Sequence, residues 1–192
     1  MDKLVEVSIR YLAEFLRLGG RIDRRFSGLA GAAEGPRIHR RLQKQGGKSY
    51  KAEVPLAIEA TMDGFTYRLS GRADGVMEEE DGIVVDEIKT TTHPFDTLTE
   101  ADYPAHWAQG CCYGYILCAQ RSLSGATIQL TYYNVDTNEI RRFRQFFTAE
   151  QLELYVHQLL AEYRPWAAFS LEWKGKRDAS LRELAFPYAH YR

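Results

Sequence analysis

The stretch 50–90 constrains the fold most, because apolar and polar residues alternate there with the period of two that is typical of β-strands. Asp63-Gly64 and Asp81-Gly82 are dipeptides that favour tight hairpin turns. The strands that we predict cover residues 50–60, 65–72, 73–79 and 82–90. Joined by short turns, they predict an antiparallel meander.

Helical periodicity lies on both sides of these strands, with apolar residues recurring every three or four positions. The helices that we predict cover residues 4–18, 30–45, 101–120 and 148–168. Two further strands are predicted over 126–134 and 139–147. This order favours an α/β domain in which helices pack on the faces of a mixed sheet.

The composition fits one globular domain, since the 192 residues are 45% hydrophobic and 27% charged. No apolar run approaches the roughly 20 residues that cross a bilayer, and the N-terminus lacks the apolar stretch of a secretory signal. We therefore expect a cytoplasmic protein without a membrane partner. The three cysteines, Cys111, Cys112 and Cys118, fall in one predicted helix, where we expect buried small side chains.

Charge is distributed unevenly along the chain, although the net charge is only −1. Residues 1–51 contain twelve Lys or Arg and five Asp or Glu, whereas residues 52–102 contain three and thirteen. A basic segment beside an acidic one suits a nuclease, which needs cations for phosphates and carboxylates for a metal. Two ordinary solvated faces would give the same pattern.

The segment from Ser70 to Thr92 contains the most informative charged residues. Asp74 begins one predicted strand, and Glu87 and Lys89 end the next one on the same face, because side chains alternate along a strand. A hairpin can bring Asp74 alongside them. Charges near the end of a buried strand are costly unless they are paired or bind a metal. Asp86 points to the other face, so we predict a supporting role for it.

These residue types suit phosphodiester hydrolysis. The reaction needs a hard cation that polarises the phosphoryl oxygen, and magnesium prefers carboxylate ligands. Lys89 could orient the attacking water or help to deprotonate it, and stabilise charge on the phosphate. A salt-bridged hairpin end would explain Glu87 and Lys89 alone, but the position of Asp74 favours the catalytic interpretation.

Several motifs together resemble the PD-(D/E)xK nucleases, specifically the RecB-like exonuclease branch. They are G-R-A-D-G at 71–75, V-V-D-E-I-K-T-T at 84–91, and Q-x-x-x-Y formed by Gln109 and Tyr113. Upstream, residues 35–39 resemble that branch's G-x-x-x-H helix, and residues 53–56 resemble its acidic strand. The resemblance spans about residues 30–120 and implies a restriction-endonuclease-like fold.

Carried over by position, the resemblance implies metal ligation by His39, Asp74 and Glu87, with the backbone carbonyl of Ile88 as a further ligand. It places Lys89 in the position of the catalytic lysine. The implied cofactor is Mg²⁺ or Mn²⁺. Some members of the family hold an iron–sulfur cluster with four cysteines, one upstream and three near the end; we expect no cluster here, because that cysteine pattern is missing from the sequence.

For the following helix, the resemblance implies that Gln109 and Tyr113 face the site and contact DNA or hold the catalytic lysine. Their spacing of four places them on one helical face. Packing through Tyr113 with Gln109 exposed is the alternative. Arg40 and Arg41, beside His39, could grip phosphates, and a solvated helix face explains them equally well.

Five aromatic residues could stack on unpaired bases, but core packing is the preferred interpretation. They are Tyr132, Tyr133, Tyr155, Tyr163 and Trp166.

The last ten residues, 183–192, resemble the opening of XPD/DinG-like helicases. We therefore predict a nuclease domain over residues 1–180, with residues 181–192 as the start of a helicase domain or a linker. The sequence has no G-x-x-x-x-G-K-[ST] loop, so we do not expect this chain itself to hydrolyse ATP.

The function predicted from these motifs is metal-dependent hydrolysis of DNA, on single strands or frayed ends, in DNA repair or processing. A catalytically silent DNA-binding or end-sensing module attached to a helicase is the first alternative. Hydrolysis of another phosphate ester would fit the metal site but not the basic segment.

Overall fold

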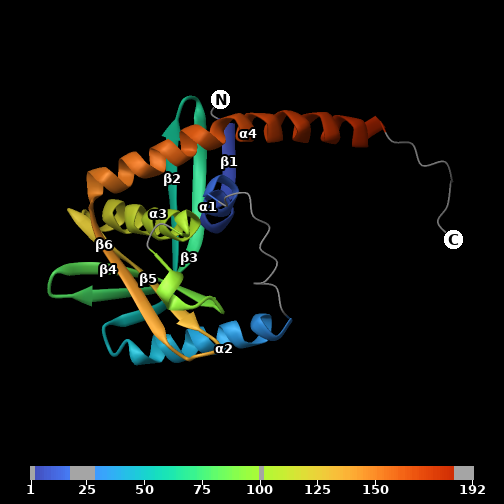
Figure 1. The fold of residues 1–192 in the computed structure, drawn as a ribbon. Helices are drawn as coiled ribbons and strands as arrows, with labels where there is room; N and C mark the ends of the chain where they lie inside the picture. Colours follow the sequence, from blue (N-terminus) through green and yellow to red (C-terminus); the bar gives the residue numbers. More distant parts are fainter. Residues whose placement is uncertain (1–2, 18–28, 100–101, 184–192) are drawn as a thin grey trace.

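The computed structural model describes residues 3–17, 29–99 and 102–183 (Figure 1). Its elements in chain order are β1 (Lys3–Ser8), α1 (Ile9–Arg17), α2 (Leu29–Gln45), β2 (Tyr50–Met62), β3 (Phe65–Glu79), β4 (Gly82–Thr91), a 3₁₀ turn η2 (Phe95–Thr97), α3 (Pro104–Arg121), β5 (Gly125–Asn134), β6 (Ile140–Thr148) and α4 (Ala149–Glu183).

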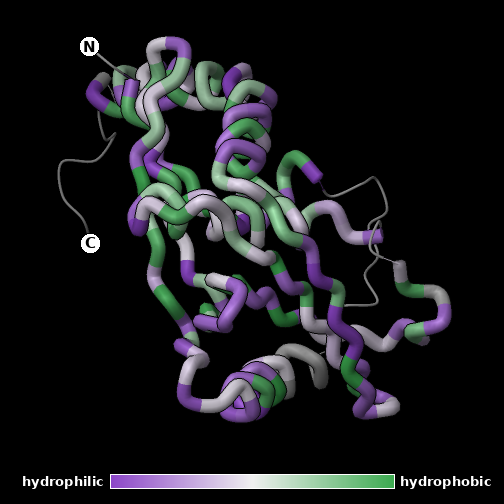
Figure 2. The backbone as a smooth tube through the Cα atoms, turned by 90° about the vertical axis from the view of Figure 1, so that its left-hand side faces the viewer, coloured by the Kyte–Doolittle hydropathy of each residue, from purple (hydrophilic) through white to green (hydrophobic). Residues whose placement is uncertain are grey.

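The strands form one six-stranded mixed sheet in the order β1-β3-β4-β5-β6, with β2 paired to β3. The pairs β2 with β3, β3 with β4, and β5 with β6 are antiparallel, whereas β1 with β3 and β4 with β5 are parallel. Green and purple segments alternate along the strands in Figure 2, as expected when side chains point to opposite faces. The predicted restriction-endonuclease-like mixed sheet is confirmed.

The edge of β3 is interrupted between two partner strands. Because β2 runs along one edge of β3, strands β1 and β4 share the opposite edge. Pairing with β1 ends at Ser70, and pairing with β4 begins at Gly75. Residues 71–74 therefore have no strand partner on this edge, and the sheet opens there.

Two helical layers cover the sheet. Helices α1, α3 and α4 pack together with the sheet in the largest core cluster, which includes the buried cysteines Cys111, Cys112 and Cys118. Helix α2 lies apart from them at the other end of the sheet (Figure 1), where Ile38 and Leu42 pack against Ile88. The cysteines are thus buried small side chains, as predicted. In the described segments, no helix is long and apolar enough to span a bilayer.

Three predicted elements differ from the structure. Residues 3–8 form a strand instead of the start of a helix, because Val5 and Val7 become buried when they pair with β3. Residues 65–79 form one strand instead of two, because β2 pairs with β3 over most of its length. Helix α4 continues past residue 168 to Glu183.

The aromatic residues assigned to the core divide into two groups. Tyr132, Tyr133 and Tyr163 are buried, and Tyr155 is half-buried against the main core. Trp166, however, is 53% exposed, so core packing is wrong for this residue. Trp166 lies on the solvent-facing side of α4, one residue before the buried Ala167.

Close packing of α3 on β5 requires glycine. A Cβ atom at Gly110 would lie 2.5 Å from Cγ2 of Ile128, a buried branched side chain whose Cγ2 atom is close to the backbone. A Cβ atom at Gly114 would lie 2.8 Å from Cδ1 of the same residue. These two glycines therefore set the distance between the helix and the sheet.

We expect Gly110→Ala to destabilise the protein by about 1 kcal/mol, because overpacking costs about 1–3 kcal/mol and the gain in helix propensity is only about 1 kcal/mol. Gly175 in α4 is a matched control, since nothing lies within 4 Å of its Cβ position, and Gly175→Ala should stabilise. Chemical denaturation measures both changes. Equal stabilisation by the two substitutions would contradict this account of the packing.

Candidate active site

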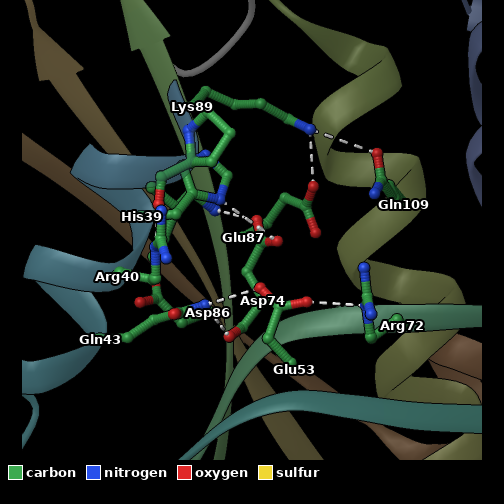
Figure 3. Close-up of polar contacts among 12 residues, drawn as sticks. His39, Arg40, Gln43, Glu53, Arg72, Asp74, Asp86, Glu87, Lys89 and Gln109 are labelled. Carbon is green, nitrogen blue, oxygen red and sulfur yellow. Dashed lines mark hydrogen bonds and ion pairs between the residues drawn. The ribbon is translucent and has the colours of Figure 1, made fainter. Parts of the chain in front are cut away.

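Asp74 lies in the interrupted segment of β3 and uses its two carboxylate oxygens differently (Figure 3). Oδ2 accepts a hydrogen bond from the backbone N–H of Ile88 at 2.8 Å, so the carboxylate replaces a strand partner for β4. Oδ1 lies 3.6 Å from Nδ1 of His39, which comes from α2. One oxygen thus fixes β4, while the other faces a potential ligand.

Glu53 approaches the same point from β2, where it lies in register with Asp74 but makes no ladder pair. Its φ of 55° is in the left-handed region, which costs a non-glycine residue roughly 1 kcal/mol or more. Gln43 of α2 donates from Nε2 to Oε1 of Glu53 and to the backbone oxygen of Asp74, both at 2.9 Å. Arg72 contacts Oε2 of Glu53 at 2.7 Å. These contacts hold the carboxylate in place despite the unfavourable backbone.

His39, Glu53 and Asp74 each offer a ligand atom, and the three atoms lie within 4.8 Å of one another. Two carboxylates and an imidazole, brought from α2, β2 and β3, form a donor set that suits a divalent cation. The first and third residues were predicted as ligands, and the structure brings them together.

Glu87 lies beside this cluster and is only 1% exposed. Its Oε1 accepts a hydrogen bond from Nζ of Lys89 at 2.6 Å, and Lys89 also contacts Oε1 of Gln109 at 3.4 Å. Burial raises the pKa of Glu87 to about 7; the charge of Asp74 adds to the rise, while Lys89 opposes it. The strand therefore holds a buried carboxyl group that has one strong cationic partner.

The second oxygen of Glu87 indicates how the cluster fits a metal ion. Oε2 is buried and accepts no hydrogen bond from the residues that the structure describes. A buried carboxylate oxygen without a partner is costly, and a cation bound between it and Asp74 would remove that cost. The donor set of His39, Asp74 and Glu87, with Glu53 nearby, therefore fits a divalent metal. Ligation by the carbonyl of Ile88, which lies in the β4–β5 ladder opposite Thr131, stays a prediction.

Gln109 and Tyr113, one turn apart on α3, take different positions. Gln109 is 7% exposed and touches Lys89, so the alternative with an exposed glutamine is wrong. Tyr113 fills the opening beside β3: a Cβ at Gly71 would lie 2.7 Å from its hydroxyl oxygen. Burial raises the pKa of Tyr113 to about 12, so its hydroxyl stays protonated.

The predicted phosphate contacts on α2 are both exposed. Nε of Arg40 donates to the backbone oxygen of Pro36 at 3.1 Å, and the guanidinium of Arg41 lies 4.7 Å from the ring centre of Tyr133. Each side chain therefore has a contact within the protein, Arg40 with the backbone of α2 and Arg41 with a ring of β5. Their contact with phosphates stays a prediction.

Asp86 lies on the opposite face of β4, as strand alternation predicted. Its carboxylate accepts hydrogen bonds from Thr131 at 2.6 Å, Gln129 at 2.8 Å and Tyr50 at 3.0 Å. Burial raises its pKa, and these donors oppose the rise. Asp86 therefore joins β4 to β5 and β2 behind Glu87.

Sequence reasoning missed three residues at the site. Gln43 is four residues after His39, so helical spacing could have placed it on the same face. Glu53 was matched to an acidic strand but was not assigned as a ligand. Arg10 lies in the first turn of α1; its pKa is raised mainly by Glu14 and further by Glu87 and Asp74, so its charge acts on the site. No local signal identified Arg10, because its position depends on the pairing of β1.

The fold and the cluster at the opening of the sheet define a restriction-endonuclease-like α/β domain with a candidate metal site. The sequence pattern of the PD-(D/E)XK nuclease superfamily matches residues 29–173, which is most of the chain, and the chain belongs to this superfamily. Nucleases of this superfamily use divalent metal ions, so the family and the donor set agree.

Solved structures with a similar fold share little sequence with this chain. SSO0001 is 17% identical, with a TM-score of 0.52 over 81% of this chain and 75% of that chain. The alkaline exonuclease LHK-Exo from Laribacter hongkongensis is 16% identical, with a TM-score of 0.49 over 92% of this chain and 94% of that chain. Comparison with curated proteins found no match. The likeness to SSO0001 supports the fold alone.

The raised pKa of Glu87 makes the stability of the metal-free protein depend on pH. A carboxyl group whose pKa is higher in the folded state stabilises the fold below its ordinary pKa of 4.5, and this contribution is lost as the pH rises towards 7. Glu87→Gln removes the ionisable group, so the variant should not lose this stability as the pH rises. In chelator, the free energy of unfolding of the variant should match that of wild type near pH 4 and exceed it at pH 8 by roughly 3 kcal/mol, from about 1.4 kcal/mol per pKa unit.

Thermal denaturation across this pH range measures the difference. Glu80→Gln removes an exposed carboxylate from the turn after β3 and serves as the control, for which we expect no such pH-dependent gain. If the stabilities of Glu87→Gln and wild type changed with pH in parallel, Glu87 would be charged in the folded protein over this whole pH range.

Proposed function

We propose that this chain is a metal-dependent deoxyribonuclease whose centre consists of His39, Asp74, Glu87 and Lys89. The observation that carries the proposal is the buried Glu87, which has an unpartnered oxygen beside Asp74 and a hydrogen bond to Lys89. A module that only binds DNA has no need for this arrangement. The costly buried carboxylate therefore favours the enzyme over the silent end-sensing module.

The metal that we propose is Mg²⁺ or Mn²⁺, held by His39, Asp74 and Glu87, with Glu53 and the carbonyl of Ile88 as further oxygen donors. Such an ion, when bound, polarises the phosphoryl oxygen and lowers the pKa of water. Gln43 and Arg72 hold the carboxylate of Glu53 near His39 and Asp74, where it could serve as a donor.

Lys89 is the residue of this chain that would place a positive charge at the reacting phosphate. Its ammonium group is positioned by Glu87 and Gln109, and it is partly exposed at the opening. We propose that it orients the attacking water and stabilises the charge that develops on the phosphate. Arg10, Arg40 and Arg41 lie at the sides of the site and supply cations for neighbouring phosphates.

The substrate that we propose is DNA with a single-stranded or frayed end, processed as in DNA repair, and the chain is assigned to the RecB-like branch. The motifs at 35–39, 71–75 and 84–91 support this assignment. The nuclease domain is proposed to span residues 1–180. Residues 181–183 continue α4, and residues 184–192, which support most of the helicase hypothesis, lie outside the described residues.

Cleavage of end-labelled DNA tests the function. Single- and double-stranded substrates, linear and circular, are incubated with Mg²⁺, Mn²⁺ or chelator, and product lengths are followed. Wild type should cut only with metal, and Asp74→Asn and Glu87→Gln should abolish cleavage, because each weakens the metal site while conserving side-chain shape.

Glu80→Gln should retain wild-type activity in the same assay. Near-normal cleavage by either site variant at saturating Mg²⁺ would exclude the proposed centre. Metal-independent DNA binding by a wild type that never cuts would indicate the silent module instead.

The role of His39 can be tested through the choice of metal. His39→Ala should lose more activity in Mg²⁺ than in Mn²⁺, because Mn²⁺ binds mixed nitrogen and oxygen sites more strongly and better tolerates a missing ligand. Calorimetric titration of Mn²⁺ should show affinity lowered by roughly tenfold or more, the scale on which even outer partners of ligands act. His157→Ala on α4 is the control. Unchanged Mn²⁺ affinity in His39→Ala would mean that His39 is only structural.

A further inference from the structure

Helix α4 consists of two halves with different surroundings. In the first half, Leu152, Val156, Leu159 and Leu160 are fully buried against the core. Ala167 is the last buried residue, and the described side chains after it are exposed or only half-buried. Figure 1 shows this second half projecting past the sheet. Its side chains are therefore available to a partner.

The projecting half presents large aromatic side chains in a row. Trp166, Phe169 and Trp173 are 53%, 52% and 54% exposed, and their spacing of three and four places them on one helical face. Their ring centres are 6.5 and 5.9 Å apart along the row. Phe15 of α1 extends the row, 5.3 Å from Trp166, and Tyr11 follows 5.6 Å further. We call these five residues the aromatic row.

The charge of α4 changes sign where the helix leaves the core. Residues 149–163 contain three glutamates and no lysine or arginine, whereas residues 164–182 contain five basic and two acidic residues. Nζ of Lys176 lies 5.4 Å from the ring centre of Trp173, and Lys174 and Arg177 line the same shallow hollow beside Phe169. Basic groups therefore follow the aromatic row.

We propose that the aromatic row and the adjacent Lys174, Lys176 and Arg177 bind single-stranded DNA. Exposed rings can stack on unpaired bases, while lysine and arginine contact phosphates, and this combination is how sequence-tolerant single-strand sites work. A duplex keeps its base faces stacked internally, so it cannot use the rings. The inference rests on the proposed function, since the bound strand is the one that the active site would cut.

The charge pattern also distinguishes this partner from a second copy of the chain. A symmetric contact through the row would place the same surface patch of each copy against its partner. The projecting segment of each copy, residues 164–182, carries a net charge of +3 from five basic and two acidic residues, so packing two such segments together costs free energy. A polyanion is attracted to this net positive charge, even though Glu172 and Asp178 already pair with Lys176 and Arg177.

Fluorescence anisotropy with a labelled oligothymidine, in chelator so that no cleavage occurs, tests the proposal. The double variant Phe169→Ala, Trp173→Ala should lower single-strand affinity about tenfold or more, from the loss of two stacking platforms. Lys174→Glu should reduce the salt dependence of binding. Phe146→Ala removes a phenylalanine that is 56% exposed on β6 and should leave affinity unchanged. Equal melting temperatures verify folding, since the substituted side chains lie outside the core.

Two results would overturn the inference. One is unchanged single-strand affinity in the double variant. The other is a wild-type dimer that the double variant converts to monomer without a change in DNA affinity, which would make the row a protein interface. Short DNA cut normally by the double variant supports the proposed function even if the row does not bind. Conversely, row-dependent binding by a wild type that never cuts supports the row and rejects the nuclease.

Discussion

The interrupted edge of β3 is the constraint on which the rest of the site depends. Strands β1 and β4 pair with different parts of that edge, so residues 71–74 between them have no strand partner. The carboxylate of Asp74 compensates by accepting the backbone N–H of Ile88, which turns a missing ladder contact into a fixed position for β4. Tyr113 fills the space beside Gly71, and α1 begins where β1 ends, which brings Arg10 close enough for the charges of Glu87 and Asp74 to raise its pKa. A break in backbone pairing is therefore what allows charged side chains to gather inside a sheet.

The electrostatics of the opening work against the stability of the metal-free protein. Asp74 and Glu87 repel each other, Glu87 is buried, and Lys89 is the one cation bonded to it among the described residues. The fold sustains this cost because its core is formed elsewhere, under α1, α3 and α4. A bound cation would reverse the balance, since it attracts both carboxylates and satisfies the unpartnered oxygen of Glu87. The residues that lower the stability of the metal-free protein would thus couple metal binding to folding.

The two faces of β4 carry different sets of charged side chains. Glu87 and Lys89 point to the face covered by α3, where Gln109 contacts the lysine. Asp86 points to the other face and is held by Gln129 and Thr131 of β5. Alternation along one strand therefore gives the neighbouring acids Asp86 and Glu87 different surroundings. Helix α4 divides similarly along its length, with one half in the core and one half presenting aromatic and basic side chains to solvent.

Local periodicity in the sequence determined much of this protein. It predicted the mixed sheet, the shared face of Glu87 and Lys89 and the opposite orientation of Asp86, because strand and helix periods fix which side chains share a face. The approach of Gln109 to the site was implied by the resemblance in the motifs. Tertiary structure alone decided the rest. Residues 3–8 became a strand through pairing with β3, Glu53 reached the cluster through a left-handed backbone, and Trp166 was exposed because the core packs against the other side of α4. Each of these outcomes depends on contacts between residues that are distant in the chain, and the local sequence pattern does not predict such contacts.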